Sequence, residues 1–179
     1  MKQEIIIAGF GGQGVLSMGK ILAYSGLMDD KEVTWMPSYG PEQRGGTANV
    51  TVILSDKRIS SPVLDKYDIV VALNQQSLDK FAPKVKAGGT LIYDTNGIHN
   101  HPKRDDIKIY PIDAMEATLE IGNSKAYNMV VMGALLKAME YKLPMENVIK
   151  GLKKSLPERH HKLIPLNEKA IEKGSELLK

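Results

Sequence analysis

The chain has 179 residues, of which 42% are hydrophobic, so it can bury one core and is predicted to form a single α/β domain over residues 1–179. Its 24 basic and 21 acidic residues give a net charge of +3 with no strongly basic block, which argues against nucleic acid as the main partner. The sequence has no cysteine for a disulfide or an iron–sulfur ligand, no signal-peptide pattern and no apolar run near the ~20 residues of a membrane span, so we expect a cytoplasmic location and no membrane association.

A glycine-rich turn follows the first predicted strand. The apolar, β-branched run over residues 5–8 is typical of a buried parallel strand, and a G-x-G-x-x-G pattern comes directly after it. We call this turn the glycine fingerprint; it comprises Gly9, Gly11, Gly12, Gln13 and Gly14. Gly9 and Gly11 can take positive φ and let another backbone or a phosphate come close, and we expect Gly14 to let the next helix pack closely on the strand. The pattern fits both an anion or nucleotide site at a helix N-terminus and a purely structural turn.

The next elements test for a dinucleotide site. Helical spacing continues from Val15 to about Leu27, and residues 33–36 are predicted to form the second strand of a right-handed βαβ unit. NAD binding in such a unit requires an acidic residue at the end of that strand to hold the ribose hydroxyls. Trp35-Met36-Pro37-Ser38 stands there instead, which argues against classical NAD binding.

The loop after this strand combines shape with chemistry. Two prolines and three glycines over residues 37–46 enclose an aromatic ring, a carboxylate, an amide and a guanidinium. Arg44 could bind a carboxylate or phosphate with two parallel hydrogen bonds, and Glu42 could orient it or face a partner. The alternative is an ordinary surface loop with an internal Glu–Arg pair. The candidate binding residues are Tyr39, Gly40, Glu42, Gln43, Arg44, Gly45 and Gly46.

The rest of the chain alternates strands and helices. Residues 47–54 are predicted to form an alternating strand that pairs antiparallel with residues 58–61 as a hairpin. Further strands are expected over residues 68–73, 90–93 and 107–112, and helices over residues 75–86, 114–121, 124–141, 145–156 and from a cap at Asn167 onward. The fold class is therefore a single doubly wound, mostly parallel sheet with helices on both faces and an antiparallel hairpin addition.

A few polar residues stand at element ends. Asn74 and Asp94 follow predicted parallel strands and fit both caps and ligands. Asn123, just before an apolar helix, fits an N-cap. His99 and His101 form an H-x-H pair without a further His or Cys nearby, so we do not expect a metal site there.

Three segments taken together resemble the gamma subunit of the 2-oxoacid:ferredoxin oxidoreductases, over nearly the whole chain. They are IIIAGFGGQGVLSMGKILA, PSYGPEQRGGTANV and GNSKAYNMVVMGALL. The tyrosine-glycine-proline-glutamate form of the loop is more similar to the 2-oxoglutarate and branched-chain members than to the pyruvate or indolepyruvate members.

The resemblance implies a subunit that is not catalytic alone. The complex would convert 2-oxoglutarate, coenzyme A and oxidised ferredoxin to succinyl-coenzyme A, CO2 and reduced ferredoxin, with a branched-chain 2-oxoacid such as ketoisovalerate as the alternative substrate. Thiamine diphosphate, Mg2+ and iron–sulfur clusters would reside on partner subunits, and this chain alone would bind none of them. The loop over residues 39–46 would face the active-site cavity or coenzyme, and Asn123 and Asn128 would lie at the subunit junction.

A second hypothesis, from a different class, is a free-standing nucleotide-binding Rossmann-like protein that uses the glycine fingerprint directly. The missing acidic residue after the second strand counts against it.

Overall fold

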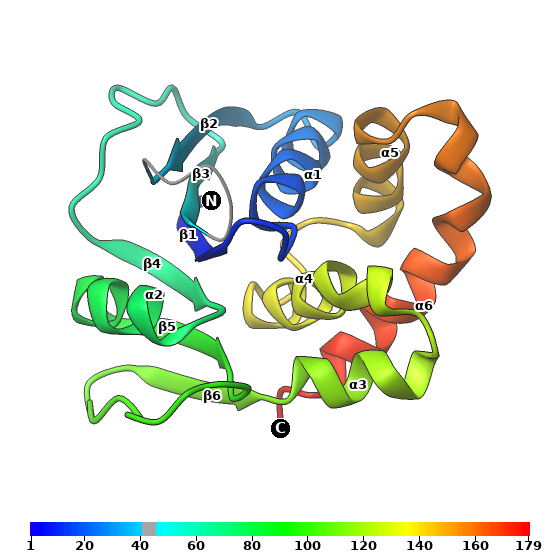
Figure 1. Cartoon of the computed structure of the whole chain (residues 1–179). Helices are drawn as coiled ribbons and strands as arrows, with labels where there is room; N and C mark the ends of the chain where they lie inside the picture. The colour runs from blue at the N-terminus through cyan, green and yellow to red at the C-terminus, as the bar shows by residue number, and fades with distance from the viewer. Residues whose placement is uncertain (41–45) are drawn as a thin grey trace.

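The computed structural model describes residues 1–40 and 46–179 and confirms the predicted α/β fold. A mixed six-stranded sheet with the strand order β2-β3-β1-β4-β5-β6 lies between helices on its two faces (Figure 1). The strands are β1 (Lys2–Phe10), β2 (Glu32–Tyr39), β3 (Thr47–Ser55), β4 (Tyr67–Ala72), β5 (Val85–Asp94) and β6 (Lys108–Ile112). The α-helices are α1 (Val15–Met28), α2 (Gln75–Phe81), α3 (Ala114–Ile121), α4 (Tyr127–Ala138), α5 (Met145–Ser155) and α6 (Ile164–Ser175). Short 3-10 helices η1 (Ala82–Lys84), η2 (Ser124–Ala126) and η3 (Glu158–Leu163) precede a strand or a helix.

The central position of strand β1 in the sheet explains why its sequence is apolar without interruption. Ile5 and Ile7 belong to the larger core cluster, which α1, α4, α5 and α6 cover. Ile6 and Ala8 belong to a second cluster on the opposite face, under α2. A central strand buried on both faces needs apolar side chains at consecutive positions, because successive side chains point to opposite faces.

The antiparallel part of the sheet is confirmed, but its pairing differs from the predicted hairpin. Strand β3 lies between β1 and β2 and is antiparallel to both, whereas β4, β5 and β6 extend β1 as parallel strands. Residues 58–61 are described but form no strand. The chain therefore crosses from β1 through α1 to β2, and β3 lies between these two strands in the sheet. Residues 40–46 connect β2 to its antiparallel neighbour β3.

Two predicted helix boundaries are wrong. The helix that begins at Gln75 ends at Phe81 and not at residue 86, and Gly88-Gly89 lies inside β5. A Cβ atom on Gly89 would lie 2.8 Å from the carbonyl oxygens of Asp68 and Lys86, so this glycine allows backbones to approach closely. The final helix begins at Ile164, which places Asn167 within the helix and not at its cap.

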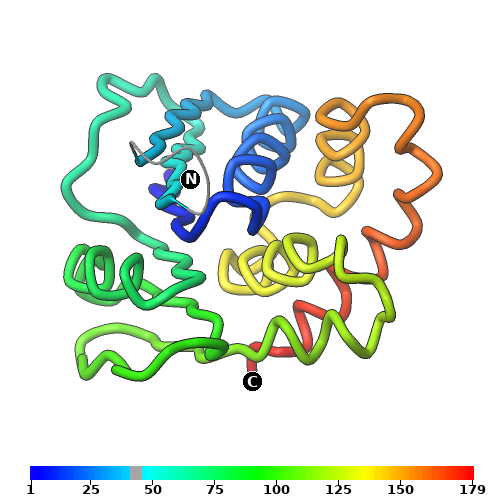
Figure 2. Tube along the Cα trace, in the orientation of Figure 1, coloured from blue at the N-terminus to red at the C-terminus, as the bar shows by residue number. Residues whose placement is uncertain are grey.

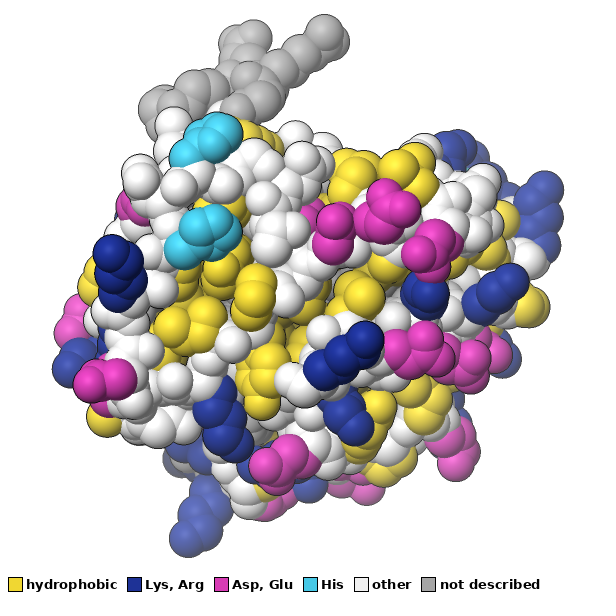
Figure 3. All heavy atoms as spheres, turned by 90° about the horizontal axis from the view of Figure 1, so that it is seen from below, with side chains coloured by type: hydrophobic (Ala, Val, Ile, Leu, Met, Phe, Trp, Pro, Cys, Tyr) yellow, Lys and Arg dark blue, Asp and Glu magenta, His cyan; other side chains and the backbone are white. Residues whose placement is uncertain are grey.

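The C-terminal helix closes the larger core. Figure 2 shows the chain passing from α5 to α6, and α6 contacts both α4 and α3. Figure 3 shows a face on which basic and acidic side chains are interspersed. In residues 1–40 and 46–179, every helix falls short of the length and apolarity needed to cross a membrane.

Candidate functional site

The sheet register brings the glycine fingerprint and the predicted binding loop together. Phe10, at the end of β1, pairs with Thr47, at the start of β3. The Gly11 N–H donates to the Gly46 carbonyl oxygen at 2.9 Å, and the Gly40 N–H donates to the Thr47 carbonyl oxygen at 2.7 Å. Both ends of the loop are therefore fixed at the carboxyl edge of the parallel strands, where open α/β sheets collect ligands.

The predicted loop residues differ in what the structure shows of them. Tyr39 is the last residue of β2, and 72% of its surface is exposed. It lies next to the loop ends at Gly40 and Gly46, which backbone hydrogen bonds hold in place. The predicted binding residues Glu42, Gln43, Arg44 and Gly45 lie outside the described residues.

The fingerprint glycines have roles that differ from the predicted ones. Positive φ occurs at Gly12, 96°, and at Gly14, 75°, rather than at Gly9 and Gly11. A Cβ on Gly9 would lie 2.5 Å from Gln13 Oε1 and 3.0 Å from Leu73 Cβ, so Gly9 is required for close packing. The prediction of positive φ was wrong because the spacing indicates a tight turn without fixing which glycine carries the left-handed conformation.

Gln13 holds this turn in place. Its Oε1 accepts from the Phe10 N–H at 2.6 Å, and its Nε2 donates to the Leu73 carbonyl oxygen at 3.1 Å. Both ends of the side-chain amide are therefore engaged, and Gln13 links the end of β1 to the end of β4.

Gly14 and Asn128, which are far apart in the sequence, are in direct contact. A Cβ on Gly14 would lie 2.7 Å from both Cβ and Nδ2 of Asn128. The close approach at Gly14 is therefore to the first turn of α4 and not, as was predicted, to the strand. The fingerprint, the two loop ends at Gly40 and Gly46, and the start of α4 form one edge of the molecule.

Asn123 is a helix cap. Its Oδ1 accepts from the Lys125 N–H at 3.0 Å, which caps η2 just before α4. The cap prediction is confirmed, and the place of Asn123 and Asn128 at a subunit junction stays a prediction.

A buried hydroxyl–carboxylate pair anchors α4 at this edge. The Tyr127 hydroxyl donates to Asp94 Oδ2 at 2.6 Å, and Asp94 is only 2% exposed. Burial raises the pKa of Asp94, although the hydrogen bond from Tyr127 opposes this. Burial and the nearby Asp94 also raise the pKa of Tyr127. The sequence indicated Asp94 as a cap or ligand but gave no signal that Tyr127 was its partner.

We predict that Asp94→Asn removes a pH-dependent loss of stability. The pKa of Asp94 is higher in the folded than in the unfolded chain, so the free energy of unfolding falls as pH rises from the usual carboxylate range through the raised pKa. Asparagine can still accept the Tyr127 bond but does not ionise. The stability of the variant relative to the native chain should therefore increase with pH, by about 1.4 kcal/mol for each unit by which the pKa is raised. Urea unfolding at several pH values measures this; a difference that stays constant would contradict it, and the exposed Asp105→Asn serves as control.

The two other polar segments noted in the sequence have structural partners. Asn74 Oδ1 accepts from the Ser77 N–H at 2.7 Å and caps α2. His101 Nδ1 lies 2.8 Å from the Tyr93 hydroxyl, and Gln75 Oε1 accepts from the His99 N–H at 2.8 Å. Among the described residues, no group of three or more His, Asp or Glu is placed to hold a metal ion.

Comparison with known proteins gives one consistent family. The family described as "Pyruvate ferredoxin/flavodoxin oxidoreductase" matches residues 4–177. The ketoisovalerate oxidoreductase subunit VorA of Methanothermobacter marburgensis is 38% identical over 173 residues, covering 97% of this chain and 36% of that protein. The 2-oxoglutarate synthase subunit KorC of Methanocaldococcus jannaschii is 35% identical over 182 residues, covering 100% of this chain and 95% of that subunit. The chain thus spans about a third of VorA and nearly all of KorC.

Solved structures agree with the sequence relatives. The gamma subunit of a keto/oxoacid ferredoxin oxidoreductase from Geobacter sulfurreducens aligns with a TM-score of 0.83 at 27% identity, covering 100% of this chain and 99% of that one. The 2-oxoglutarate:ferredoxin oxidoreductase from Magnetococcus marinus, solved with 2-oxoglutarate, coenzyme A and succinyl-CoA bound, aligns with a TM-score of 0.87 at 25% identity. That match covers 98% of this chain and 31% of the other.

Proposed function

Because the chain belongs to the pyruvate ferredoxin/flavodoxin oxidoreductase family, as a gamma subunit of the 2-oxoacid:ferredoxin oxidoreductases, we propose that it helps to enclose the active site of such an enzyme. The reaction would take place on the other subunits. The observation that carries this proposal is the Gly11–Gly46 hydrogen bond, which joins the fingerprint to the end of the loop at Gly46. A loop sequence rich in polar side chains, held at both ends by backbone hydrogen bonds, can bind and orient an anion.

The proposed substrate is 2-oxoglutarate, oxidised with coenzyme A and ferredoxin to succinyl-coenzyme A and CO2. Support comes from the KorC relative, which this chain matches over nearly its whole length, and from the Magnetococcus structure. The VorA relative has slightly higher identity and supports a branched-chain 2-oxoacid as the second candidate. The tyrosine-glycine-proline-glutamate loop is compatible with both.

The cofactors would be held by the other subunits. The chain has no cysteine to ligate a cluster, and its described residues contain no set of carboxylates or histidines that fits a metal ion. We therefore assign thiamine diphosphate, Mg2+ and the clusters to the partner subunits. This chain's part would be to orient the anionic substrate and coenzyme through the loop over residues 39–46.

An apolar surface along β2 fits a subunit that is covered by its partners. Trp35 and Tyr39 on the edge strand β2 are 42% and 72% exposed, and Leu27 on α1 is 52% exposed. An exposed apolar edge strand is a poor surface for an isolated protein. In two relatives the matched region makes up only about a third of a longer polypeptide, so we propose that the catalytic part of the enzyme covers this surface.

Reconstitution with the co-expressed catalytic subunits tests the function. We expect the chain alone to be colourless and inactive, and the complex to reduce viologen with coenzyme A and 2-oxoglutarate faster than with ketoisovalerate or pyruvate. Trp35→Glu should weaken assembly at least roughly tenfold, about 1.4 kcal/mol, because it buries a charge in the interface. Leu119→Glu, at a side chain 64% exposed on α3, should assemble normally.

Two results would count against the proposal. Oxidation of a 2-oxoacid by the isolated chain would contradict the assignment of catalysis to the other subunits. Normal assembly of Trp35→Glu, measured by sedimentation, would show that β2 faces solvent in the complex.

A further inference from the structure

Asp94 has an unusual setting for a carboxylate. It is the last residue of β5 and only 2% exposed, and among the residues that the structure describes it forms no ion pair with a basic side chain. Its oxygens instead accept from the Tyr127 hydroxyl at 2.6 Å, from the Asn96 N–H at 3.2 Å and from the Ala114 N–H. A carboxylate buried without a cation is costly, so its presence at the carboxyl edge of the sheet indicates a role beyond packing.

The hydrogen bond from Tyr127 ties a helix to a fixed point of the sheet. Asp94 is fixed because β5 pairs with β6 as far as Asp94 and Ile112, and the next N–H, that of Thr95, donates to the Ile112 carbonyl oxygen at 2.9 Å. Tyr127 is the first residue of α4, and its side chain is buried. The bond therefore holds the start of α4 at the carboxyl ends of the parallel strands.

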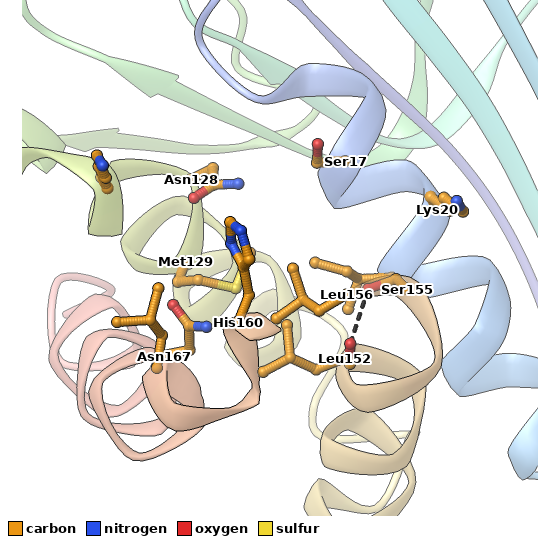
Figure 4. A pocket seen from close by; sticks show the side chains of 12 residues that line it. Ser17, Lys20, Asn128, Met129, Leu152, Ser155, Leu156, His160 and Asn167 are labelled. Carbon is orange, nitrogen blue, oxygen red and sulfur yellow. Dashed lines mark hydrogen bonds between the residues drawn. The ribbon is translucent and has the colours of Figure 1, made fainter. Parts of the chain in front are cut away.

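Packing alone supports the first turn of α4 incompletely. Asn128, the residue after Tyr127, touches the fingerprint, since a Cβ on Gly14 would lie 2.7 Å from Asn128 Cβ. Beyond this contact a cavity of about 290 Å3 separates α4 from α1, and Figure 4 shows Asn128 directed into this space, with Ser17 on the α1 side. Apolar packing has no preferred direction and is interrupted here, whereas a hydrogen bond to a carboxylate is directional. The Tyr127 hydroxyl therefore determines where α4 meets the fingerprint.

We propose that Asp94 and Tyr127 are positioning residues for the enzyme reaction, because their hydrogen bond holds the first turn of α4 against the glycine fingerprint. This inference rests on the proposed function, in which the same edge helps to enclose the active site. Asp94 and Tyr127 are 2% and 9% exposed, so they act through the fingerprint, whose Gly11 N–H holds the loop end at Gly46. Loss of such a support disturbs the geometry of the transition state more than the binding of substrate, so it should lower kcat more than it raises KM.

Hydrogen exchange in the isolated full-length chain tests the structural half of the proposal. Tyr127→Phe removes the hydroxyl and keeps the ring. The hydrogen-bonded N–H groups of Gly11 and Gln13 should exchange at least roughly fivefold faster in this variant, beyond any change in the amides of β4. Tyr93→Phe is the matched control, because it removes a buried hydroxyl that lies 2.8 Å from His101 Nδ1 on the opposite face of the sheet. It should leave both fingerprint amides unchanged.

Turnover of the reconstituted complex tests the functional half. Tyr127→Phe should lower kcat at least roughly fivefold and change the KM for the 2-oxoacid by less than about twofold, whereas Tyr93→Phe should leave both unchanged. Asp94→Asn should lower kcat less than Tyr127→Phe does, because its amide oxygen can still accept from the hydroxyl. Combining Asp94→Asn with Tyr127→Phe separates positioning from stability. The combined variant lacks the buried carboxylate that has lost its donor, so it should unfold at a higher denaturant concentration than Tyr127→Phe but keep the low kcat.

Three results would overturn the proposal. A kcat that recovers together with stability in the combined variant would show that the pair only supports the fold. Unchanged exchange at Gly11 and Gln13 in Tyr127→Phe would show that the bond does not hold the fingerprint. Faster exchange with an unchanged kcat would show that the reaction does not depend on this support. A native complex that oxidises no 2-oxoacid would instead contradict the proposed function, on which the exchange measurement does not depend.

Discussion

Alanine at Gly133 should destabilise the chain by about 3 kcal/mol or more. Helices α4 and α6 cross with their backbones in contact at Gly133 and Gly174. A Cβ on Gly133 would overlap the carbonyl oxygen of Ile171 and lie 2.8 Å from its carbonyl carbon. A Cβ on Gly174 would in turn lie 2.6 Å from the Val130 carbonyl carbon. Because backbone cannot rotate away as a side chain can, α6 must move off α4 and partly expose Ile171 and Val130, which are now fully buried.

Helix propensity alone predicts the opposite sign for the effect of Gly133→Ala on stability. Alanine is favoured over glycine within a helix by about 1 kcal/mol, so an open helix surface at position 133 would make Gly133→Ala stabilising. Denaturant unfolding followed by circular dichroism distinguishes the two signs. Gly97→Ala is the control: its φ of 73° strains an alanine, but no atom lies within 4 Å of the added Cβ, so it should cost only about 1 kcal/mol. A Gly133→Ala chain as stable as the native one would contradict the close crossing.

The local patterns of the sequence predict most elements but not all of their neighbours. The uninterrupted apolar run in β1 and the glycine spacing after it define the first strand and helix, and the structure confirms them. The insertion of β3 between β1 and β2 depends on pairing between residues about 40 positions apart, such as Phe10 with Thr47. Hydrophobic alternation shows that β3 is a strand but does not say which strand it joins.

In the candidate site, too, the sequence identifies the segments but not the contacts between them. The fingerprint, the loop and the start of α4 could each be identified from residue types. That Gly11 bonds to Gly46, and that Gly14 leaves room for Asn128, follows only from the assembled sheet. Tyr127 was missed because an aromatic residue at the start of an apolar helix is usually part of the core, and only burial of Asp94 beside it reveals its polar role.

Arginine 44 is the residue whose loss we expect to reduce turnover most. Arg44→Ala should lower turnover of the reconstituted complex at least roughly tenfold, which corresponds to ~1.4 kcal/mol of lost transition-state or coenzyme binding. Arg44 is four residues after Gly40 and two before Gly46, and both glycines are held to β3 or the fingerprint at the carboxyl edge of the sheet. The proposed substrate and both coenzymes are anionic, so a guanidinium carried by this loop would attract and orient them.

Two further variants, Arg44→Lys and Arg58→Ala, show whether Arg44 acts through its charge or through the shape of its guanidinium. Arg44→Lys should restore turnover only in part, because lysine keeps the charge but cannot form two parallel hydrogen bonds. Arg58→Ala removes the same charge from an exposed position beyond the far end of β3 and should leave turnover unchanged. Assembly and thermal unfolding should be unaffected in all three variants. If Arg44→Ala assembles normally and keeps full kinetics for both 2-oxoacid and coenzyme A, the loop serves as an interface or a structural turn, and its assignment to the active-site cavity is wrong.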